Sequence, residues 1–316
     1  MTNAVNIAQI GSNNTTFRNR IINGAMGIWQ RGTSFTSGGT ATYTADRFYG
    51  NGSSGTISRS TDVPAGFTYS FSNAASSTAF PGITQRIESV NIADCASQAI
   101  TVSFYVKQTS GTASALNINL AYPSAVDNWG SSTTIVETNV VATMPSSWTR
   151  YSYTYTLPAN VTNGLSATLF IPSGSVTATF LITGVQLEAG STASPFEYRS
   201  YGTELALCQR YFEIYSNGTG TSAIFEGLGG YFANSSIFRT AVPFKVTKRA
   251  SPSVSVPITY LTVNCLAGNL TPSGAGSNFS SPDGAAINCY VSGATGGQGA
   301  TLGISSSAPV KISAEL

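Results

Sequence analysis

The sequence contains no histidine, and only 9% of its residues are charged, against roughly 25% in an average soluble protein. Without imidazole there is no Ser-His-Asp or Cys-His triad and no histidine metal site. The formal net charge is +2, and the densest basic run, Lys245–Arg249, is too short for the basic stripe that nucleic acids require. No run of about 18 apolar residues exists. We therefore expect neither nucleic-acid binding nor membrane insertion.

Cysteine is also scarce. The four cysteines, Cys95, Cys208, Cys265 and Cys289, lie far apart, and no Cys-x-x-Cys pair indicates a metal or redox motif. We expect small buried hydrophobic residues, with a Cys265–Cys289 disulfide as the alternative. Residues 1–30 lack the basic and apolar regions of a secretory signal. Together these features predict a protein made in a reducing cytoplasm.

Strand patterns dominate what is present. In Ile100–Lys107, the alternation places one set of apolar side chains on one face, namely Ile100, Val102, Phe104 and Val106. Thr101, Ser103, Tyr105 and Lys107 fall on the other face. Similar alternation runs through Leu116–Tyr122, Trp148–Leu157 and Val176–Val185. Such period-2 runs between Gly, Pro, Asn and Ser predict half-buried antiparallel strands in a β-sandwich.

One segment breaks the β pattern. Thr203–Phe212 consists of good helix formers, with Leu205, Cys208 and Phe212 on one face. It predicts a short connecting helix. After it, alternating stretches predict a second β-rich region with strands at Gly230–Phe238, Arg239–Val246, Ser253–Tyr260, Leu261–Leu266, Ala286–Val291 and Ala308–Leu316. Gly268–Gly284 and Ser292–Gly299, rich in Gly and Ser, predict loops.

Several separated blocks resemble those of bacteriophage tail-fibre proteins and follow the same order. They are Arg18–Met26, Trp29–Gly32, Tyr43–Phe48, Ile182–Gly190 running into Pro195–Gly202, and Leu205–Phe212. The resemblance covers about residues 18–212. It implies an all-β chain with an N-terminal jelly-roll β-sandwich (18–199), a connector helix (200–212) and a C-terminal β-sandwich tip domain (213–316). Residues 1–17 would form a segment that anchors the chain to the virion.

A looser resemblance links the first sandwich to jelly-roll carbohydrate-binding modules. In that family a strand such as Ile21–Gly24 lies beside a last strand such as Phe180–Leu187. The tail-fibre resemblance further implies a homotrimer, for which Leu205, Cys208 and Phe212 are the interface candidates.

The function that the resemblance implies is a non-catalytic tail fibre or baseplate appendage of a phage virion, made in the host cytoplasm. Its N-terminal segment would bind other phage tail or baseplate proteins. The chain would contact host cell-surface polysaccharide or lipopolysaccharide during adsorption. Three alternatives stay open: a purely structural baseplate component, a tailspike that depolymerises a glycan, and a bacterial carbohydrate-binding module outside any virus.

Aromatic residues beside amides and carboxylates are the candidates for glycan binding, because rings stack on the C–H faces of sugars while polar groups bind the hydroxyls. The segment Tyr122–Gly130 contributes Tyr122, Asp127, Asn128 and Trp129, and the C-terminal region contributes Tyr260 and Tyr290. The alternative for each ring is packing on its own sandwich or on a neighbouring subunit. Trp29 and Trp148 stand in strand-like contexts that predict core positions.

Acidic residues give weaker signals. Glu188, Glu197 and Glu204 cluster in sequence, and a pair of carboxylates would serve a glycosidase. The 13 acidic residues are otherwise dispersed, so we expect no catalytic residue and no cofactor. Asp46-Arg47 predicts a structural turn or salt bridge. A structural calcium ion is the alternative among metals, although no Asp-rich loop of the EF-hand type supports it.

Overall fold

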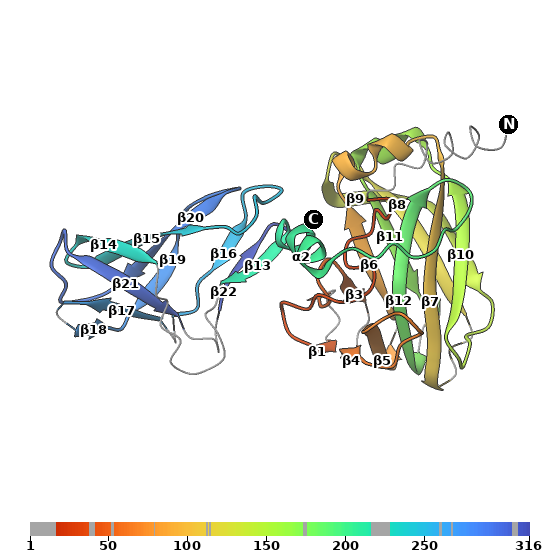
Figure 1. Cartoon of the computed structure of the whole chain (residues 1–316), viewed down its shortest axis with the longest axis horizontal. Coiled ribbons are helices and arrows are strands. Elements are labelled where there is room, and N and C mark those ends of the chain that lie inside the picture. Colours follow the sequence, from red (N-terminus) through yellow and green to blue (C-terminus); the bar gives the residue numbers. More distant parts are fainter. Residues whose placement is uncertain are drawn as a thin grey trace. The chain divides into compact units, whose positions relative to one another are not determined.

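The computed structural model describes residues 17–37, 42–51, 54–78, 80–111, 113, 115–172, 176–215, 228–258, 261–266, 268–304 and 309–316. It confirms an all-β chain with a short helix, α2 (Tyr201–Gln209), which is the only α-helix among these residues (Figure 1). The chain divides into two compact units, residues 1–204 with Leu316 and residues 205–315. Within the described ranges, no helix has the length and apolarity that crossing a membrane requires.

The first unit is a jelly-roll sandwich of two antiparallel six-stranded sheets. In order across it, one sheet contains β1 (Ser34–Ser37), β4 (Gly55–Ser60), β5 (Ser70–Thr78), β12 (Val176–Ala189), β7 (Ala99–Gly111) and β10 (Thr149–Thr156). The other contains β2 (Thr42–Tyr43), β3 (Tyr49–Asn51), β6 (Gly82–Ile87), β11 (Leu165–Phe170), β8 (Leu116–Ala125) and β9 (Asn128–Val141). Three 3-10 turns complete it, at Ser89–Asn91, Ala93–Cys95 and Ala159–Asn163.

In strand β7 the predicted burial of one face is confirmed, but the other face is more buried than a half-buried strand would be. Its apolar face is fully buried in the core between the sheets, as predicted. Thr101 and Ser103, on the opposite face, are also buried. The reason is that residues 190–199 return over this face, where the Thr101 hydroxyl donates to the Gly190 carbonyl (2.8 Å). The strand is therefore covered on both faces.

Residues 19–24 lie beside β12 without forming a strand, so the predicted strand Ile21–Gly24 is wrong. Its predicted place beside the last strand is confirmed. The Arg20 N–H donates to Leu187 O (2.8 Å) and the Val185 N–H donates to Gly24 O (3.0 Å). Between them the Asn19 side chain replaces backbone pairing, donating to Val185 O (3.1 Å) and accepting from the Leu187 N–H (3.0 Å).

The second unit contains two antiparallel sheets around a smaller core. The three-stranded sheet consists of β13 (Phe212–Tyr215), β22 (Val310–Ser313) and β16 (Ser253–Ser255). The seven-stranded sheet runs in the order β18 (Gly268–Leu270), β17 (Leu261–Cys265), β21 (Gly299–Ile304), β14 (Gly229–Asn234), β15 (Ile237–Pro243), β20 (Gly284–Tyr290) and β19 (Gly274–Ser281).

The predicted loop Gly268–Gly284 is wrong, because it contains both β18 and β19. Both are edge strands of the seven-stranded sheet. An edge strand needs only backbone pairing on one side, so it lacks the apolar alternation by which strands are recognised. The other predicted loop is confirmed, since no strand lies between Val291 and the start of β21 at Gly299.

Helix α2 begins at Tyr201 and ends at Gln209, so the predicted span Thr203–Phe212 is displaced. Phe212 is the first residue of β13 instead. Cys208 and Phe212 are both buried within the single chain, and Leu205 is half-buried. The side chains of Cys208 and Phe212 therefore do not stand on a surface that a second copy reaches, and the homotrimer stays a prediction.

All four cysteines are free, so the alternative Cys265–Cys289 disulfide is wrong. Cys265 lies on β17 and Cys289 on β20, with three strands between them in the sheet. Cys95, Cys208 and Cys289 are buried, as expected of small hydrophobic residues, whereas Cys265 is only half-buried. Burial raises the pKa of the Cys289 thiol to about 12, which leaves it uncharged and unreactive at neutral pH.

Two further expectations concern individual side chains. Trp29 is a core residue, as predicted, but Trp148 is only half-buried, and its indole N–H donates to Asp62 (2.8 Å). Within the basic run Lys245–Arg249, the Lys248 side chain is fully buried. Its Nζ atom lies 3.0 Å from a carboxylate oxygen of Glu213. Burial lowers the pKa of Lys248, and Glu213 opposes that shift.

Candidate functional site

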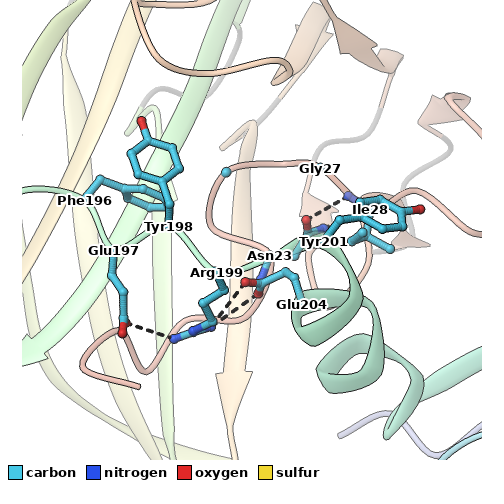
Figure 2. Close-up of a pocket in the computed structure, with 10 residues that line it drawn as sticks. Asn23, Gly27, Ile28, Phe196, Glu197, Tyr198, Arg199, Tyr201 and Glu204 are labelled. Carbon is cyan, nitrogen blue, oxygen red and sulfur yellow. Dashed lines mark hydrogen bonds and ion pairs between the residues drawn. The ribbon is translucent and has the colours of Figure 1, made fainter. Parts of the chain in front are cut away.

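A small pocket opens on the first unit where residues 23–28 meet the segment after β12. It is lined by Asn23, Ala25, Gly27, Ile28, Phe196, Glu197, Tyr198, Arg199, Tyr201 and Glu204, and its volume is about 160 Å³ (Figure 2). This is below the roughly 300–1,000 Å³ of pockets for drug-sized ligands. Its size therefore suits one small ring or one unit of a longer chain.

One wall is the loop Asn23–Ile28, whose shape is fixed by hydrogen bonds to the Asn23 side chain. Its amide donates to Ile28 O (2.9 Å) and Asp46 O (3.0 Å), and its oxygen accepts from the Ile28 N–H (2.9 Å). Asn23 and Met26 have φ angles of 60° and 56°, which L-residues rarely adopt. The Trp29 indole N–H donates to Met26 O (2.7 Å) and holds the second of these. The wall is thus formed before any ligand arrives.

The floor is an ion-pair cluster centred on Arg199, whose side chain is nearly buried. Its guanidinium lies 3.4 Å from Glu197 and 3.3 Å from Glu204, which Figure 2 shows on either side of it. Glu197 also accepts from the backbone N–H of Asn19 (2.6 Å), and Glu204 accepts from that of Asn23. The cluster therefore ties residues 197–204 to residues 19–23.

Aromatic rings form the outer side. Phe196 and Tyr198 lie edge to face with centroids 4.9 Å apart, and Phe67 lies 5.1 Å from Phe196. Phe67 and Tyr105 flank Gly184, whose φ is +63° and where a Cβ would lie 2.8 Å from the Phe67 ring. Only glycine fits there. The rings rest on the sheet, and Tyr198 is 58% exposed beside the pocket.

Tyr201, in the first turn of α2, adds a second exposed ring to the pocket, at 67% exposure. The site thus combines two accessible phenol rings with carboxylates that are already fixed by Arg199.

The three acidic residues considered for catalysis all have structural partners. Glu188 is buried, and it accepts from the Ser194 N–H (2.9 Å), the Ser194 hydroxyl (2.6 Å) and the Gln186 amide (2.8 Å). Glu197 and Glu204 share Arg199 and bind backbone N–H groups. These contacts join chain segments. The absence of catalysis stays a prediction.

The Asp46-Arg47 pair forms a turn, as predicted. Arg47 has a φ of 70°, and the Phe48 N–H donates to Ala45 O (2.9 Å). Asp46 accepts from the Gln30 N–H (3.0 Å) and Arg47 donates to Arg86 O (2.6 Å). Both side chains are buried.

The segment predicted to present Tyr122, Asp127, Asn128 and Trp129 is a hairpin between β8 and β9, not a loop. Tyr122 lies in β8, half-buried against the core. Asp127 accepts from the Ser89 N–H (2.8 Å) and hydroxyl (3.1 Å), and Asn128 accepts from the Gly130 N–H (3.0 Å). The Trp129 ring lies under the Arg86 guanidinium at 4.9 Å. Their role in glycan binding stays a prediction.

Two candidates lie in the C-terminal region. Tyr290, at the end of β20, is 48% exposed. Tyr260 lies outside the described residues, as do residues 1–16 of the predicted anchoring segment. Among the described residues, no group of three or more Cys, Asp or Glu side chains is placed to hold a metal. The calcium ion stays an alternative without a candidate site.

Sequence reasoning did not single out Tyr198, Tyr201 or Arg199 as site residues. A signal was present, because the blocks that carry the tail-fibre resemblance, Arg18–Met26 and Pro195–Gly202, supply the two walls. These blocks lie more than 160 residues apart in the sequence, and only the fold brings them together.

No protein-family model matches this sequence, and no curated protein does. Solved structures with a similar backbone include the enzymatically active domain of bacteriophage CBA120 tailspike protein 4, at 16% identity and a TM-score of 0.37, over 55% of this chain and 22% of that one. The C-terminal family 22 carbohydrate-binding module of Clostridium thermocellum Xyn10B has 15% identity and a TM-score of 0.37, over 57% of this chain and 99% of the module.

A xylan-binding domain of Paenibacillus barcinonensis Xyn10C gives 14% identity and a TM-score of 0.34, over 46% of this chain and 92% of the domain. This chain thus spans less than a quarter of the tailspike and nearly all of each module.

Proposed function

We propose that this chain is a non-catalytic tail-fibre or baseplate-appendage protein of a phage virion, and that its first unit binds a host cell-surface glycan in the pocket beside Tyr198 and Tyr201. The observation that carries the glycan proposal is the pairing of these two exposed rings with a preformed pocket that contains the Arg199 ion-pair cluster. The virion role rests on the sequence blocks that resemble tail-fibre proteins. The proposed ligand is a polysaccharide or lipopolysaccharide.

The tyrosine rings and the pocket carboxylates would contact different parts of a sugar. A sugar ring has apolar C–H faces that stack on a phenol ring, and hydroxyls that donate to carboxylates. Glu197 and Glu204 are held by Arg199 and by backbone N–H groups. Because their positions are fixed in advance, a hydroxyl that binds them costs little further ordering.

The test is binding of the purified full chain to an immobilised panel of bacterial lipopolysaccharides and capsular polysaccharides. Tyr198→Ala and Tyr201→Ala should each weaken binding about tenfold, as expected for truncating an aromatic anchor. Phe80→Ala is the matched control, because Phe80 is 53% exposed and does not line the pocket. It should bind as the wild type does, and thermal unfolding should show that all variants fold.

Three results would contradict the proposal. Failure to bind any member of the panel would favour the purely structural baseplate component. Unchanged binding by both tyrosine variants would show that the pocket is not the glycan-binding site. Release of oligosaccharides from a bound polysaccharide would make the chain a depolymerase, and Glu197→Gln and Glu204→Gln would then be the first variants to examine. Sedimentation equilibrium tests the homotrimer, which a stable monomer at micromolar concentration contradicts.

A further inference from the structure

The seven-stranded sheet of the second unit has one face in the core and an outer face that carries chemistry of its own. Phe238 on β15 and Cys289 on β20 are fully buried in the core. Because successive side chains alternate between faces, their neighbours Arg239 and Asn288 belong to the outer face. The two residues are opposite one another, and Arg239 is also opposite Tyr231 on β14.

Asn288 is buried without being satisfied. It is 6% exposed, and within the described ranges its Oδ1 atom is buried and has no hydrogen-bond partner. Leaving a buried polar atom unpaired costs about 1–3 kcal/mol, and such atoms are rare in native proteins. This cost is offset when a ligand supplies the missing hydrogen bond.

Arg239, beside Asn288, is a cation without a counterion. Over the described part of the chain it makes no salt bridge and no hydrogen bond through its side chain, and its Nε atom is buried. A guanidinium presents a planar set of donors that matches a carboxylate in two parallel hydrogen bonds. Arg239 therefore offers an anion a specific geometry as well as a charge.

The surroundings of this pair suit a flat, chain-like ligand. Gly276, opposite Asn288 on β19, opens space, since a Cβ there would contact nothing within 4 Å. Tyr290 lies on β20 two residues beyond Asn288, and Phe279, opposite Ala286, lies on the other side. They are 48% and 74% exposed. Ala286 and Tyr290 are four residues apart on β20, which places the two rings roughly 13–14 Å apart along the strand.

We propose that this outer face binds an acidic saccharide, with Arg239 holding a sugar carboxylate. Asn288 bonds a neighbouring hydroxyl, and the rings of Tyr290 and Phe279 support sugar units on either side. The inference rests on the proposed glycan binding for its ligand class, but it assigns a second site with a different requirement. The pocket of the first unit selects no charge, whereas this face selects a carboxylate.

The experiment compares acidic capsular polysaccharides with the same polymers after chemical reduction of their carboxyl groups to alcohols, each titrated with the full chain. The wild type should bind at least one acidic polymer and lose about 10- to 100-fold in affinity on its reduced form, as expected for a charge-assisted bidentate contact. Arg239→Met should weaken binding of the acidic polymer by a similar factor and leave the reduced form unaffected.

Asn288→Asp provides the sharper variant, because it places a carboxylate beside Arg239 that competes with the ligand. It should abolish selection for the acidic polymer while thermal unfolding stays at or above that of the wild type. Lys311→Gln is the matched control, since it removes one exposed positive charge from the same unit. It should retain the preference for the acidic polymer.

The outcomes separate this site from the pocket. Loss of acidic selectivity in Arg239→Met with retained dependence on Tyr198 supports both sites. Equal binding of the acidic and reduced polymers, or wild-type selectivity in Arg239→Met, overturns the second site and leaves the first intact. An equal loss in Lys311→Gln also overturns it, because the effect would then be that of net charge. Polymers that bind through phosphate groups alone, with no response to carboxyl reduction, count against it as well.

Discussion

Two buried amide side chains, one in each unit, differ in how far they are hydrogen-bonded. In the first unit, Gln186 on β12 is fully buried because residues 190–199 cover it, and its amide donates to Glu188 (2.8 Å) and accepts from the Glu197 N–H (2.8 Å). In the second unit, Asn288 is nearly as buried, yet its Oδ1 atom lacks a partner among the described residues. A satisfied amide stabilises a fold, whereas a buried unsatisfied one costs free energy until a water or a ligand supplies the missing hydrogen bond.

The largest expected effect is a difference of sign between these two amides. Gln186→Leu should lower the free energy of unfolding by about 2–3 kcal/mol, because it leaves buried groups without their hydrogen bonds. Asn288→Leu should raise it by about 1 kcal/mol, because it removes an unpaired polar atom and strands favour apolar contacts. Denaturant unfolding of both variants measures the pair.

A destabilised Asn288→Leu would break the comparison, since it would mean that this amide already has a partner. An unchanged free energy of unfolding in Gln186→Leu would also contradict it, because the hydrogen bonds of Gln186 would then contribute nothing to stability. If the signs are as expected, Asn288 is a residue retained at a cost in stability, which is common at binding sites.

The next largest effect is expected at Gly184, where aromatic rings cover the sheet of the first unit. Gly184→Ala should cost about 2–3 kcal/mol, through the positive φ and through contact of the new methyl with Phe67 and Tyr105. The matched control is Gly190→Ala, where φ is +109° but nothing lies within 4 Å of the added Cβ. It should cost about 1 kcal/mol for the backbone alone.

Thermal or urea unfolding of the two glycine variants gives the difference that belongs to the aromatic cover. Equal losses would show that the rings move aside freely.

The smallest expected effect is a pH dependence at Asp62. The hydrogen bond from Lys107 (2.7 Å), joined by one from the Trp148 indole, lowers the pKa of this carboxyl. The ionised form is therefore favoured by folding, and its contribution is present above the unfolded pKa of about 3.9 and is lost as pH falls through the folded value. Because the side chain is 38% exposed, Asp62→Asn should cost under about 1 kcal/mol at pH 7.

Unfolding curves of the wild type and Asp62→Asn from pH 7 to pH 2.5 check this sign. The two curves should converge below about pH 4. A difference that grows on acidification would contradict the assignment of the lowered pKa to Asp62.

The sequence predicted the fold class well where local periodicity and burial coincide. In β7 the apolar face was identified correctly, from Ile100 to Val106. The burial of Thr101 and Ser103 depends on a segment about 90 residues later, and no local pattern reports it. Edge strands such as β19 were missed for a related reason, since their backbone pairing needs no apolar side chains.

The sites were harder to predict than the fold. The pocket joins residues 23–28 to residues 196–204, so it exists only after the ends of the sandwich meet. The predicted group at Tyr122–Trp129 failed as an open loop because a two-residue turn pulls it into a hairpin. Tyr290 was a predicted glycan-binding residue, but Arg239 and Asn288 were not. Their significance lies in missing partners, which a sequence does not display.

Hydrogen exchange of the full chain, with and without a bacterial polysaccharide that it retains, tests whether the first unit binds a glycan in its pocket without cleaving it. Reducing ends are assayed in the same samples. We expect slower exchange at residues 22–30 and 195–204 and no release of reducing ends. Slower exchange elsewhere in the first unit with none at these two segments, or steady release of reducing ends, would contradict this expectation.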